Sequence, residues 1–437
     1  MTIKQIHNSL NAQIDKLSEV SWFFLKNPQK DFTRRRKVCF RDIITFLLSM
    51  EAKSTTNELL DYYKCVASLP SASALRQQRD KILPEAFEFL FWEFAKAFTS
   101  DNAEYRGYRL LAVDGSDLPI AADPSDPDCY YPGTNGQRHY SLLHLNALYD
   151  LRQKTYMDAI VQKSRKANEQ KALCNMIDRS DILNAILLAD RGYEGYNCLA
   201  HLQEKGWKFL FRIKDSTGGI ASGLDLPDSE EFDLPVSLQL SNKQSNAAKL
   251  LYLNKNQYRF LPRTVTFDFL PSKSRKADPM LFYTLHFRVV RFRISEDSFE
   301  TVITNLDFPP DDLKQLYAMR WGIETAFRDL KYTIGLSAFH SKKAEHILQE
   351  IFARLTMYNF SERITACVVI RRGRKKYAYQ ANFSAAVHIC RKFLRENVHP
   401  PDVEALLARF ILPVRPDRKR TRKLTPKGFV SFLYRVA

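Results

Sequence analysis

Two short apolar runs that each end in an aspartate limit most strongly what this chain can fold into. The first is LLAVDGSD, in which Asp114 follows residues 110–113, and the second is ILLADRGYEG, in which Asp190 follows residues 186–189. Short apolar runs bounded by turn residues predict buried strands, here each followed by a loop. NEQKALCNMID and YNCLAHLQEKG, on either side of the second run, have helical spacing. The chain is therefore expected to form an α/β layer with acidic residues at its strand ends.

Other segments extend this pattern in both directions. SLLHLNALYD, YMDAIVQKS and WKFLFRIK predict further strands, so the expected order is three strands, helix, strand, helix, strand. Residues 1–105 have helical spacing, with Ser71 or Ser73 as an N-cap, and two short helices there could form either a helix-turn-helix DNA reader or a plain helical hairpin. From 215 to 305, YRFLPRTVTFDFL and MLFYTLHFRVVRFRIS alternate apolar and polar residues. They predict a β-rich insertion in which Val290, Phe292 and Ile294 face a core.

The stretch YAMRWGIETAFRDLK, residues 317–331, predicts one continuous amphipathic helix. At 100° per residue four of its side chains share one line beside the buried stripe, and Arg328 lies close to that line. The four are Tyr317, Arg320, Glu324 and Lys331. Surface ion pairs would explain the charges singly, but a glutamate ringed by cations also suits a site that handles phosphates. Trp321 is expected to pack against the protein.

Asp114, Asp190 and Glu324 together supply three hard oxygen donors from two strand ends and one helix. Such donors suit Mg²⁺ or Mn²⁺, and a pair of these ions can activate a water or hydroxyl in a phosphodiester displacement. The cations of the helix would then hold phosphates, Arg320 through its fork and Lys331 as a point charge. Nearby, Asp117 is interpreted as a turn residue, and His139 and His144 as structural histidines.

The sequence resembles the DDE transposases of bacterial insertion sequences, in the family marked by a Tyr-x2-Arg-x3-Glu-x6-Lys signature. The spacing from Tyr317 through Arg320 and Glu324 to Lys331 matches that signature without a gap. AVDGSD and LLADRGYEG match the segments around the first two acidic positions, Asp114 and Asp190. The resemblance covers residues 105–360.

The resemblance implies an α/β, ribonuclease H-like mixed sheet with a β-rich insertion, preceded by an N-terminal helical domain and followed by a basic helical C-terminal region. The corresponding boundaries are a DNA-binding domain at 1–105, the first part of the catalytic core at 106–214, the insertion at 215–305, the end of the core at 306–365, and the basic region at 366–437.

The resemblance also implies an activity and a set of site residues. The activity is metal-dependent cleavage at the inverted-repeat ends of the element and transfer of the freed 3′ hydroxyl into target DNA, carried out by a homodimer with two Mg²⁺, for which Mn²⁺ can substitute. Asp114, Asp190 and Glu324 become catalytic metal ligands. The expected DNA contacts are Tyr317, Arg320, Lys331, Arg328 and, unless it pairs internally, Arg191. Relatives that cut through a hairpin hold a flipped base with an aromatic of the insertion; Tyr258, Phe260 or Phe267 could serve here.

Composition agrees with a DNA-binding protein. The formal net charge is +17 and the pI is about 9.4, and a surplus of this size favours a polyanionic partner. Two basic clusters, RRGRKK and RPDRKRTRK, lie at 371–376 and 415–423. The cysteines form no CxxC pair, and no apolar signal core or run of about 18 apolar residues occurs. These features predict a soluble, cytoplasmic protein without zinc or a membrane partner, and the resemblance implies that the cytoplasm is bacterial.

Three other interpretations remain open at this point. The first is a metal-dependent endonuclease on the same fold that cuts without integrating. The second is a catalytically inactive, domesticated DNA-binding protein. The third is a recombinase that uses Tyr317 as a covalent nucleophile, although such an enzyme has no use for three metal-binding carboxylates.

Overall fold

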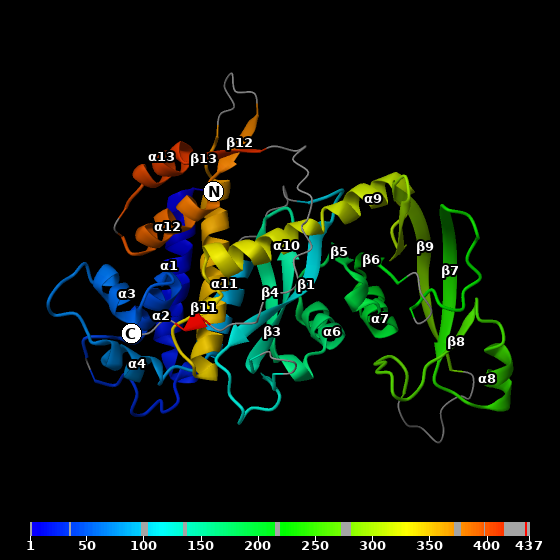
Figure 1. Cartoon of the computed structure of the whole chain (residues 1–437), viewed down its shortest axis with the longest axis horizontal. Coiled ribbons are helices and arrows are strands. Elements are labelled where there is room, and N and C mark those ends of the chain that lie inside the picture. The colour runs from blue at the N-terminus through cyan, green and yellow to red at the C-terminus, as the bar shows by residue number, and fades with distance from the viewer. Residues whose placement is uncertain are drawn as a thin grey trace.

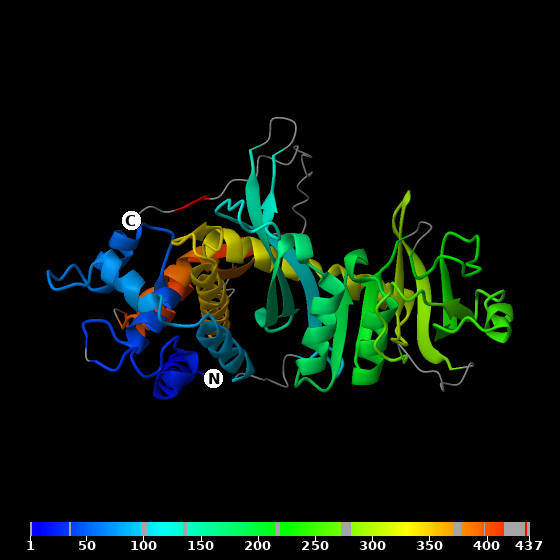
Figure 2. The same ribbon diagram turned by 90° about the horizontal axis from the view of Figure 1, so that it is seen from below.

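The structure is a computed structural model that describes residues 2–34, 36–97, 104–133, 138–214, 219–271, 281–370, 377–396, 398–414 and 433–434. Helices from the two ends of the chain gather at one end of the molecule, and a long mixed sheet extends to the other end (Figures 1 and 2). The basic clusters at 371–376 and 415–423 lie outside the described residues. Within the described ranges no helix is both long and apolar enough to span a membrane.

The N-terminal part is helical, as expected from its spacing. Its five α-helices are α1 (Ile3–Glu19), α2 (Phe40–Ser49), α3 (Thr55–Tyr62), α4 (Ala72–Arg79) and α5 (Glu85–Lys96). The hydroxyl of Ser71 accepts a hydrogen bond from the Ala74 amide and caps α4, which settles the choice between the two candidate serines. A 3₁₀ turn, Ser21–Phe24, follows α1.

A long helix, α11 (Ala344–Ala366), joins these helices to the sheet. It is buried on nearly all sides, because α1, α2 and α5 contact it from one direction and β4 contacts it from the other (Figure 1). Two C-terminal helices, α12 (Phe383–Leu394) and α13 (Asp402–Arg409), cover the same end of the molecule. The N-terminal and C-terminal helices therefore share one core with one face of the sheet.

The sheet has ten strands. They are β1 (Arg109–Ile120), β2 (Tyr130–Tyr131), β3 (Tyr140–Asp150), β4 (Thr155–Lys163), β5 (Ala185–Ala189), β6 (Lys208–Arg212), β7 (Phe232–Ser241), β8 (Tyr258–Phe260), β9 (Tyr283–Ser295) and β10 (Ser298–Thr304). β3 runs antiparallel to β1 and β4, whereas β5 runs parallel to β1 and β6. With α6 (Glu169–Arg179) and α7 (Tyr196–Lys205) as connections, this is the ribonuclease H-like order that the sequence predicted.

Three details of the sheet differ from expectation. β1 does not end at Asp114 but continues to Ile120, because β3 pairs with it along that length, and Asp117 is therefore a strand residue rather than a turn residue. Residues 258–270 contain only the three-residue strand β8. Val290 and Phe292 are buried as expected, but Ile294 is 47% exposed because it lies near the tip of the β9–β10 hairpin.

The β-rich segment at 215–305 is not a separate layer. β10 pairs antiparallel with β6, and β9, β7 and β8 follow in order, so these strands continue the core sheet to its far end (Figure 1). The remaining strands form two small pairs, β11 (Ala338–Phe339) with β14 (Leu433–Tyr434), and β12 (Ala378–Ala381) with β13 (Ile411–Val414). All seven cysteines are free thiols.

Candidate active site

The register of β1 and β5 brings two of the predicted carboxylates together. These strands are parallel neighbours in which Arg109 pairs with Ala185 and Ala112 pairs with Leu188. Continuing that register by two residues places Asp114 beside Asp190, which directly follows β5. Neighbouring strands lie about 4.8 Å apart, so the two side chains leave one sheet face as close neighbours. The shared strand-end pattern of the sequence therefore corresponds to a shared position in space.

Each aspartate is held by the amide of a glycine that follows it. The Gly115 amide donates a hydrogen bond to Oδ1 of Asp114 at 2.9 Å. The Gly192 amide donates to Oδ1 of Asp190 at 2.8 Å, which makes Asp190 the cap of a 3₁₀ turn. These bonds fix one oxygen of each carboxylate and leave the other available.

The third carboxylate comes from an interrupted helix, not from the continuous one that the sequence predicted. α9 (Pro310–Ala318) ends before Arg320, α10 (Trp321–Arg328) carries Glu324, and a π-helix (Asp329–Thr333) follows directly. α10 lies across β1, with Phe327 against the ring of Tyr156 at a centroid distance of 5.8 Å. The break and the π-turn arise from the contact of α10 with the sheet. A calculation of helical angles from the sequence assumes a regular helix and cannot predict them.

Arg320 lies between the first and third carboxylates. Its Nη2 donates to Oε1 of Glu324 at 2.8 Å, and its Nη1 lies 4.0 Å from Oδ2 of Asp114. The side chain is 7% exposed, and its guanidinium also lies over the rings of Tyr317 and Trp321. One buried cation therefore brings Glu324 close to Asp114 on β1, next to which Asp190 follows the end of β5.

The pKa values show that the carboxylates influence one another. Burial raises the pKa of Asp114 to about 6, and the charges of Asp190 and Glu324 raise it further, against the Gly115 amide and the Arg320 cation. Burial also raises the pKa of Tyr317 to about 12. A carboxylate whose pKa is raised mainly by burial, and that lies beside two other acids, is characteristic of a site that binds a cation.

A family comparison decides what kind of protein presents this site. The family described as "Transposase DDE domain" matches residues 105–360, which is more than half of the 437 residues. The chain belongs to this family. The matched range is the one over which the sequence resembles DDE transposases, and it contains all three carboxylates of the site. No curated protein matches the chain.

One solved structure is similar to the transposase in overall fold. It is described as the "Cryo-EM structure of piggyBac transposase synaptic complex with hairpin DNA (SNHP)". The TM-score is 0.42 and the sequence identity 11%, over 95% of this chain and 84% of that chain.

The π-helix places Lys331 close to Asp117 and Asp114. Its Nζ donates to the backbone carbonyl of Asp117 at 3.0 Å. Burial lowers the pKa of Lys331, while the charges of Asp117 and Asp114 oppose that change. The four signature residues thus meet at one place even though the helix that carries them is broken.

The outer cations and Trp321 face solvent. Arg328 is exposed and its closest acidic neighbour is Asp329 at 3.9 Å, and Arg191 is exposed without an ion pair to any residue that the structure describes. Trp321 was expected to pack, but its side chain is 53% exposed because it lies on the outer side of α10, in contact with Arg320. His144 has the structural partners expected of it, Asp117 and Glu169. Tyr317, in contrast, is buried at 5% exposure.

The donor set suits a divalent cation. Asp114, Asp190 and Glu324 offer only hard oxygen atoms. The raised pKa of Asp114 means that burial disfavours its charged form, and a bound cation would offset that cost. Among the described residues no group of three or more His, Cys, Asp or Glu side chains already has the arrangement of a metal centre. Arg320 supplies the compensating positive charge in this arrangement.

Glu169 was not anticipated as a site residue. It is the first residue of α6, directly after the N-cap Asn168, and an acidic residue there is an ordinary helix signal. The structure places its carboxylate near Gly115 and Gly192, the glycines that hold the two aspartates. Only the folded chain shows this proximity.

Replacing Gly322 by valine tests how closely α10 must approach the sheet. A Cβ at this position would lie 2.7 Å from Cδ2 of Leu151, in the β3–β4 turn. We expect Gly322→Val to lower the free energy of unfolding by about 1 kcal/mol, because the valine must displace the Leu151 side chain where α10 meets the turn. Helix propensity alone predicts the opposite sign, since valine favours a helix more than glycine does.

Denaturant unfolding measures this change. Thr325→Val, on the exposed face of the same helix, is the matched control and should unfold like the unchanged protein. A Gly322→Val protein as stable as the Thr325→Val protein would show that close contact at this position is not needed.

Proposed function

We propose that the chain is the transposase of a bacterial insertion sequence. It binds the inverted-repeat ends as a homodimer, cleaves them and joins the freed 3′ hydroxyls to target DNA, and it works in the cytoplasm at the nucleoid. The observation that carries the proposal is the convergence of Asp114, Asp190 and Glu324 around Arg320, within a domain that belongs to the DDE transposase family.

Asp114, Asp190 and Glu324 would hold two Mg²⁺, for which Mn²⁺ can substitute. Bound there, such ions supply activation of the attacking water or 3′ hydroxyl and stabilisation of the leaving oxygen. The Gly115 and Gly192 amides orient the aspartates for this task. Arg320, which pairs with Glu324 in this structure, would bind a phosphate beside Lys331 when Glu324 holds a metal. Tyr317 lies beside Arg320 at the site. Because the Tyr317 side chain is buried, it would contact DNA only after Arg320 moves.

The exposed Arg328 and Arg191 would bind flanking phosphates. The catalytic core would comprise residues 106–214 and 306–365, with 215–305 as the insertion that extends the sheet and 366–437 as a basic region against DNA. Residues 1–105 would bind the element ends.

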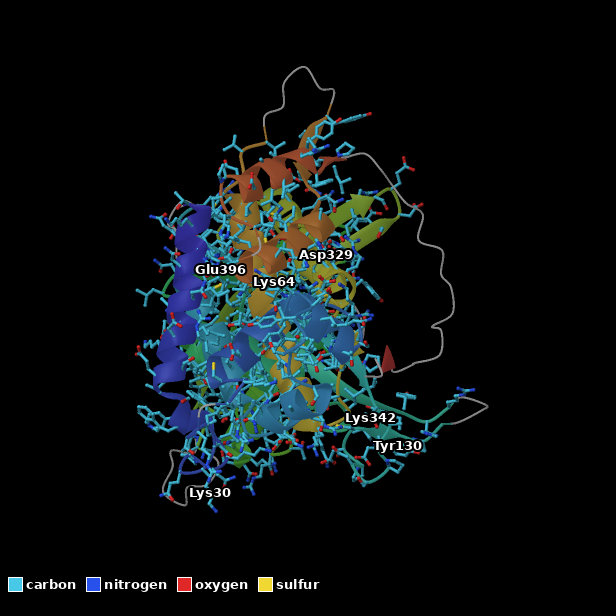
Figure 3. All side chains as sticks on the ribbon, turned by 90° about the vertical axis from the view of Figure 1, so that its left-hand side faces the viewer. Lys30, Lys64, Tyr130, Asp329, Lys342 and Glu396 are labelled. Carbon is cyan, nitrogen blue, oxygen red and sulfur yellow. The ribbon has the colours of Figure 1, made fainter. Side chains whose placement is uncertain are left out.

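A basic groove supports DNA binding by the N-terminal helices. A cavity of about 830 Å³ lies beside the end of α1 and the segment before α2, and Lys30, Arg34 and Arg36 line it. Two further cations of the groove, Arg41 and Lys81, have acidic neighbours. The first three have no acidic partner among the residues that the structure describes, and Figure 3 shows Lys30 at the outer end of this region. We name Lys30, Arg34 and Arg36 the groove cations.

Replacing the groove cations by glutamine should weaken binding to the element ends. Each phosphate contact contributes about 0.9 to the slope of log K against log salt, so the triple variant should reduce that slope by about 2–3. Fluorescence anisotropy with a labelled inverted-repeat duplex, at several salt concentrations, measures the slope.

The control removes the same charge from the opposite end of the molecule, at three exposed cations in and around α8 (Asn246–Leu251). They are Lys249, Lys255 and Arg263. Equal losses of slope in the two triple variants would mean that only the overall charge matters and that the groove is not the contact surface.

Purified protein, Mg²⁺, an inverted-repeat duplex and a supercoiled target plasmid test the proposed function together. The proposal expects cuts at the repeat end and joined products in the plasmid. Cutting without joining would instead indicate an endonuclease on this fold. Specific binding without cutting would indicate an inactive DNA-binding protein.

A further inference from the structure

Glu169 lies across the backbones that hold the two catalytic aspartates. Its Oε1 is 2.5 Å from the point that a Cβ on Gly115 would occupy, and its Oε2 is 3.1 Å from the corresponding point on Gly192. The same two glycines donate their amides to Asp114 and Asp190. One carboxylate therefore touches both aspartate-bearing segments, one through each oxygen.

The position of Glu169 is fixed by a chain of polar contacts. Nε2 of His144 lies 3.1 Å from Oε1 of Glu169, and Nδ1 of His144 lies 2.8 Å from Oδ1 of Asp117. The backbone carbonyl of Asp117 accepts from Lys331 at 3.0 Å. The chain joins α6, β3, β1 and the π-helix, which are the elements that surround the two aspartates.

His144 also compensates the charge of Glu169. Burial favours the neutral ring, but the hydrogen bonds to Asp117 and Glu169 outweigh it and raise the pKa of His144 to about 9. A protonated His144 between two carboxylates pairs with Glu169 beside Gly115, where its Nε2 and Oε1 of Glu169 both lie 2.5 Å from the point that a Cβ would occupy. Glu169 is then held as a spacer and is not drawn toward a cation at the aspartates.

We propose that Glu169, held by His144, is a positioning residue that sets the separation of the Asp114 and Asp190 carboxylates and thereby the affinity of the site for divalent cations. This inference rests on the proposed function. The physical reason is the absence of side chains at Gly115 and Gly192: the Glu169 carboxylate fills the space that a Cβ would take at both glycines, together with His144 at Gly115, and so packs against both aspartate-bearing segments at once.

The test measures Mn²⁺ binding, not activity, by electron paramagnetic resonance on the full chain bound to an uncut repeat duplex. We expect Glu169→Ala to weaken Mn²⁺ binding by about 10-fold or more, as residues that orient metal ligands commonly do. Glu169→Gln keeps the shape of the spacer and should bind Mn²⁺ nearly as well as the unchanged protein. Lys171→Ala, exposed on the same helix, is the control and should have no effect.

Two results would overturn the positioning role. One is unchanged Mn²⁺ binding by Glu169→Ala. The other is an equally large loss in Glu169→Ala and Glu169→Gln, which would make Glu169 a metal ligand itself. If Glu169→Ala does not fold, His144→Ala serves in its place: weakened Mn²⁺ binding supports the role and unchanged binding contradicts it. Equal Mn²⁺ binding by the unchanged protein and by Asp114→Ala would instead contradict the proposed function, and the spacer role with it.

Discussion

Asp114→Asn should reduce cleavage of the inverted-repeat end at least about a thousandfold, equivalent to about 4 kcal/mol of transition-state stabilisation. The amide keeps the shape of Asp114 and its bond from Gly115 but removes the charge that attracts a cation. Binding to the repeat should be unchanged, because the groove cations and the outer arginines are intact. Gel assays of cleavage and anisotropy of the same duplex measure the two properties separately.

The same variant should be more stable than the unchanged protein when metal is removed. Because the folded pKa of Asp114, about 6, lies above its usual value of 3.8, the fold favours the protonated acid. The stability associated with that proton is complete below the usual pKa and is lost as the pH rises through about 6. At neutral pH Asp114→Asn avoids this loss, which is about 3 kcal/mol for a pKa raised from 3.8 to about 6.

Denaturant unfolding with a chelator at pH 7.5 measures the stability change. Asp123→Asn, on the exposed turn after β1, is the control and should change neither cleavage nor stability. Cleavage retained by Asp114→Asn would remove this residue from the site. An Asp114→Asn protein that is less stable than the unchanged protein would contradict the conclusion that the buried charge of Asp114 destabilises the fold at neutral pH.

Glu350→Ala should give the largest loss of stability, about 3–5 kcal/mol, because it leaves buried cations without their counter-charge. Glu350 lies on α11 at 1% exposure. Its Oε1 is 3.0 Å from Nη1 of Arg79 on α4, and its Oε2 is 3.2 Å from Arg354 and 3.1 Å from Nδ1 of His340. The residue thereby ties the N-terminal helices to the segment that follows the Lys331 turn.

The effect of Glu350→Ala should depend on pH. Burial alone would raise the pKa of Glu350, but Arg79, His340 and Arg354 more than offset it and hold that pKa well below its usual 4.5. A depressed acid pKa contributes stability that is present above the unfolded pKa and is lost as the pH falls. The difference between the two proteins should therefore be full at neutral pH and narrow in acid.

Unfolding of both proteins between pH 3 and pH 8 follows this difference. Glu345→Ala, exposed in the first turn of the same helix and paired only at the surface with Lys26, should cost less than about 1 kcal/mol. Equal losses of stability in Glu350→Ala and Glu345→Ala would contradict a structural role for the buried ion pairs of Glu350. A stability difference between Glu350→Ala and the unchanged protein that widens in acid would also contradict it.

Local patterns in the sequence were sufficient to predict the strands that carry Asp114 and precede Asp190. Asp114 and Asp190 end or interrupt runs of buried residues, and both the strands and their order along the chain are visible in hydrophobic periodicity. The signature around Glu324 was also visible as a spacing. These features depend on neighbouring residues, which is why they could be predicted.

Other features depend on contacts between distant segments. The break before Trp321 and the π-turn at Lys331 arise where α10 meets β1 and Leu151, and no angular calculation on a regular helix contains those contacts. The pairing of β10 with β6 joins the insertion to the core sheet through residues about 90 apart in sequence. Glu169 resembles any acidic first residue of a helix until α6 is placed against Gly115 and Gly192.

The most direct test is diffraction from crystals of the transposase with an uncut repeat duplex and Mn²⁺. It shows whether one metal centre is shared by Asp114 on β1, Asp190 after β5 and Glu324 on α10. Anomalous peaks should lie about 2.1 Å from carboxylate oxygens of Asp114, Asp190 and Glu324, with Arg320 no longer paired to Glu324. Mn²⁺ bound away from these residues, or Glu324 still paired with Arg320 beside a cation that it does not touch, would contradict the account.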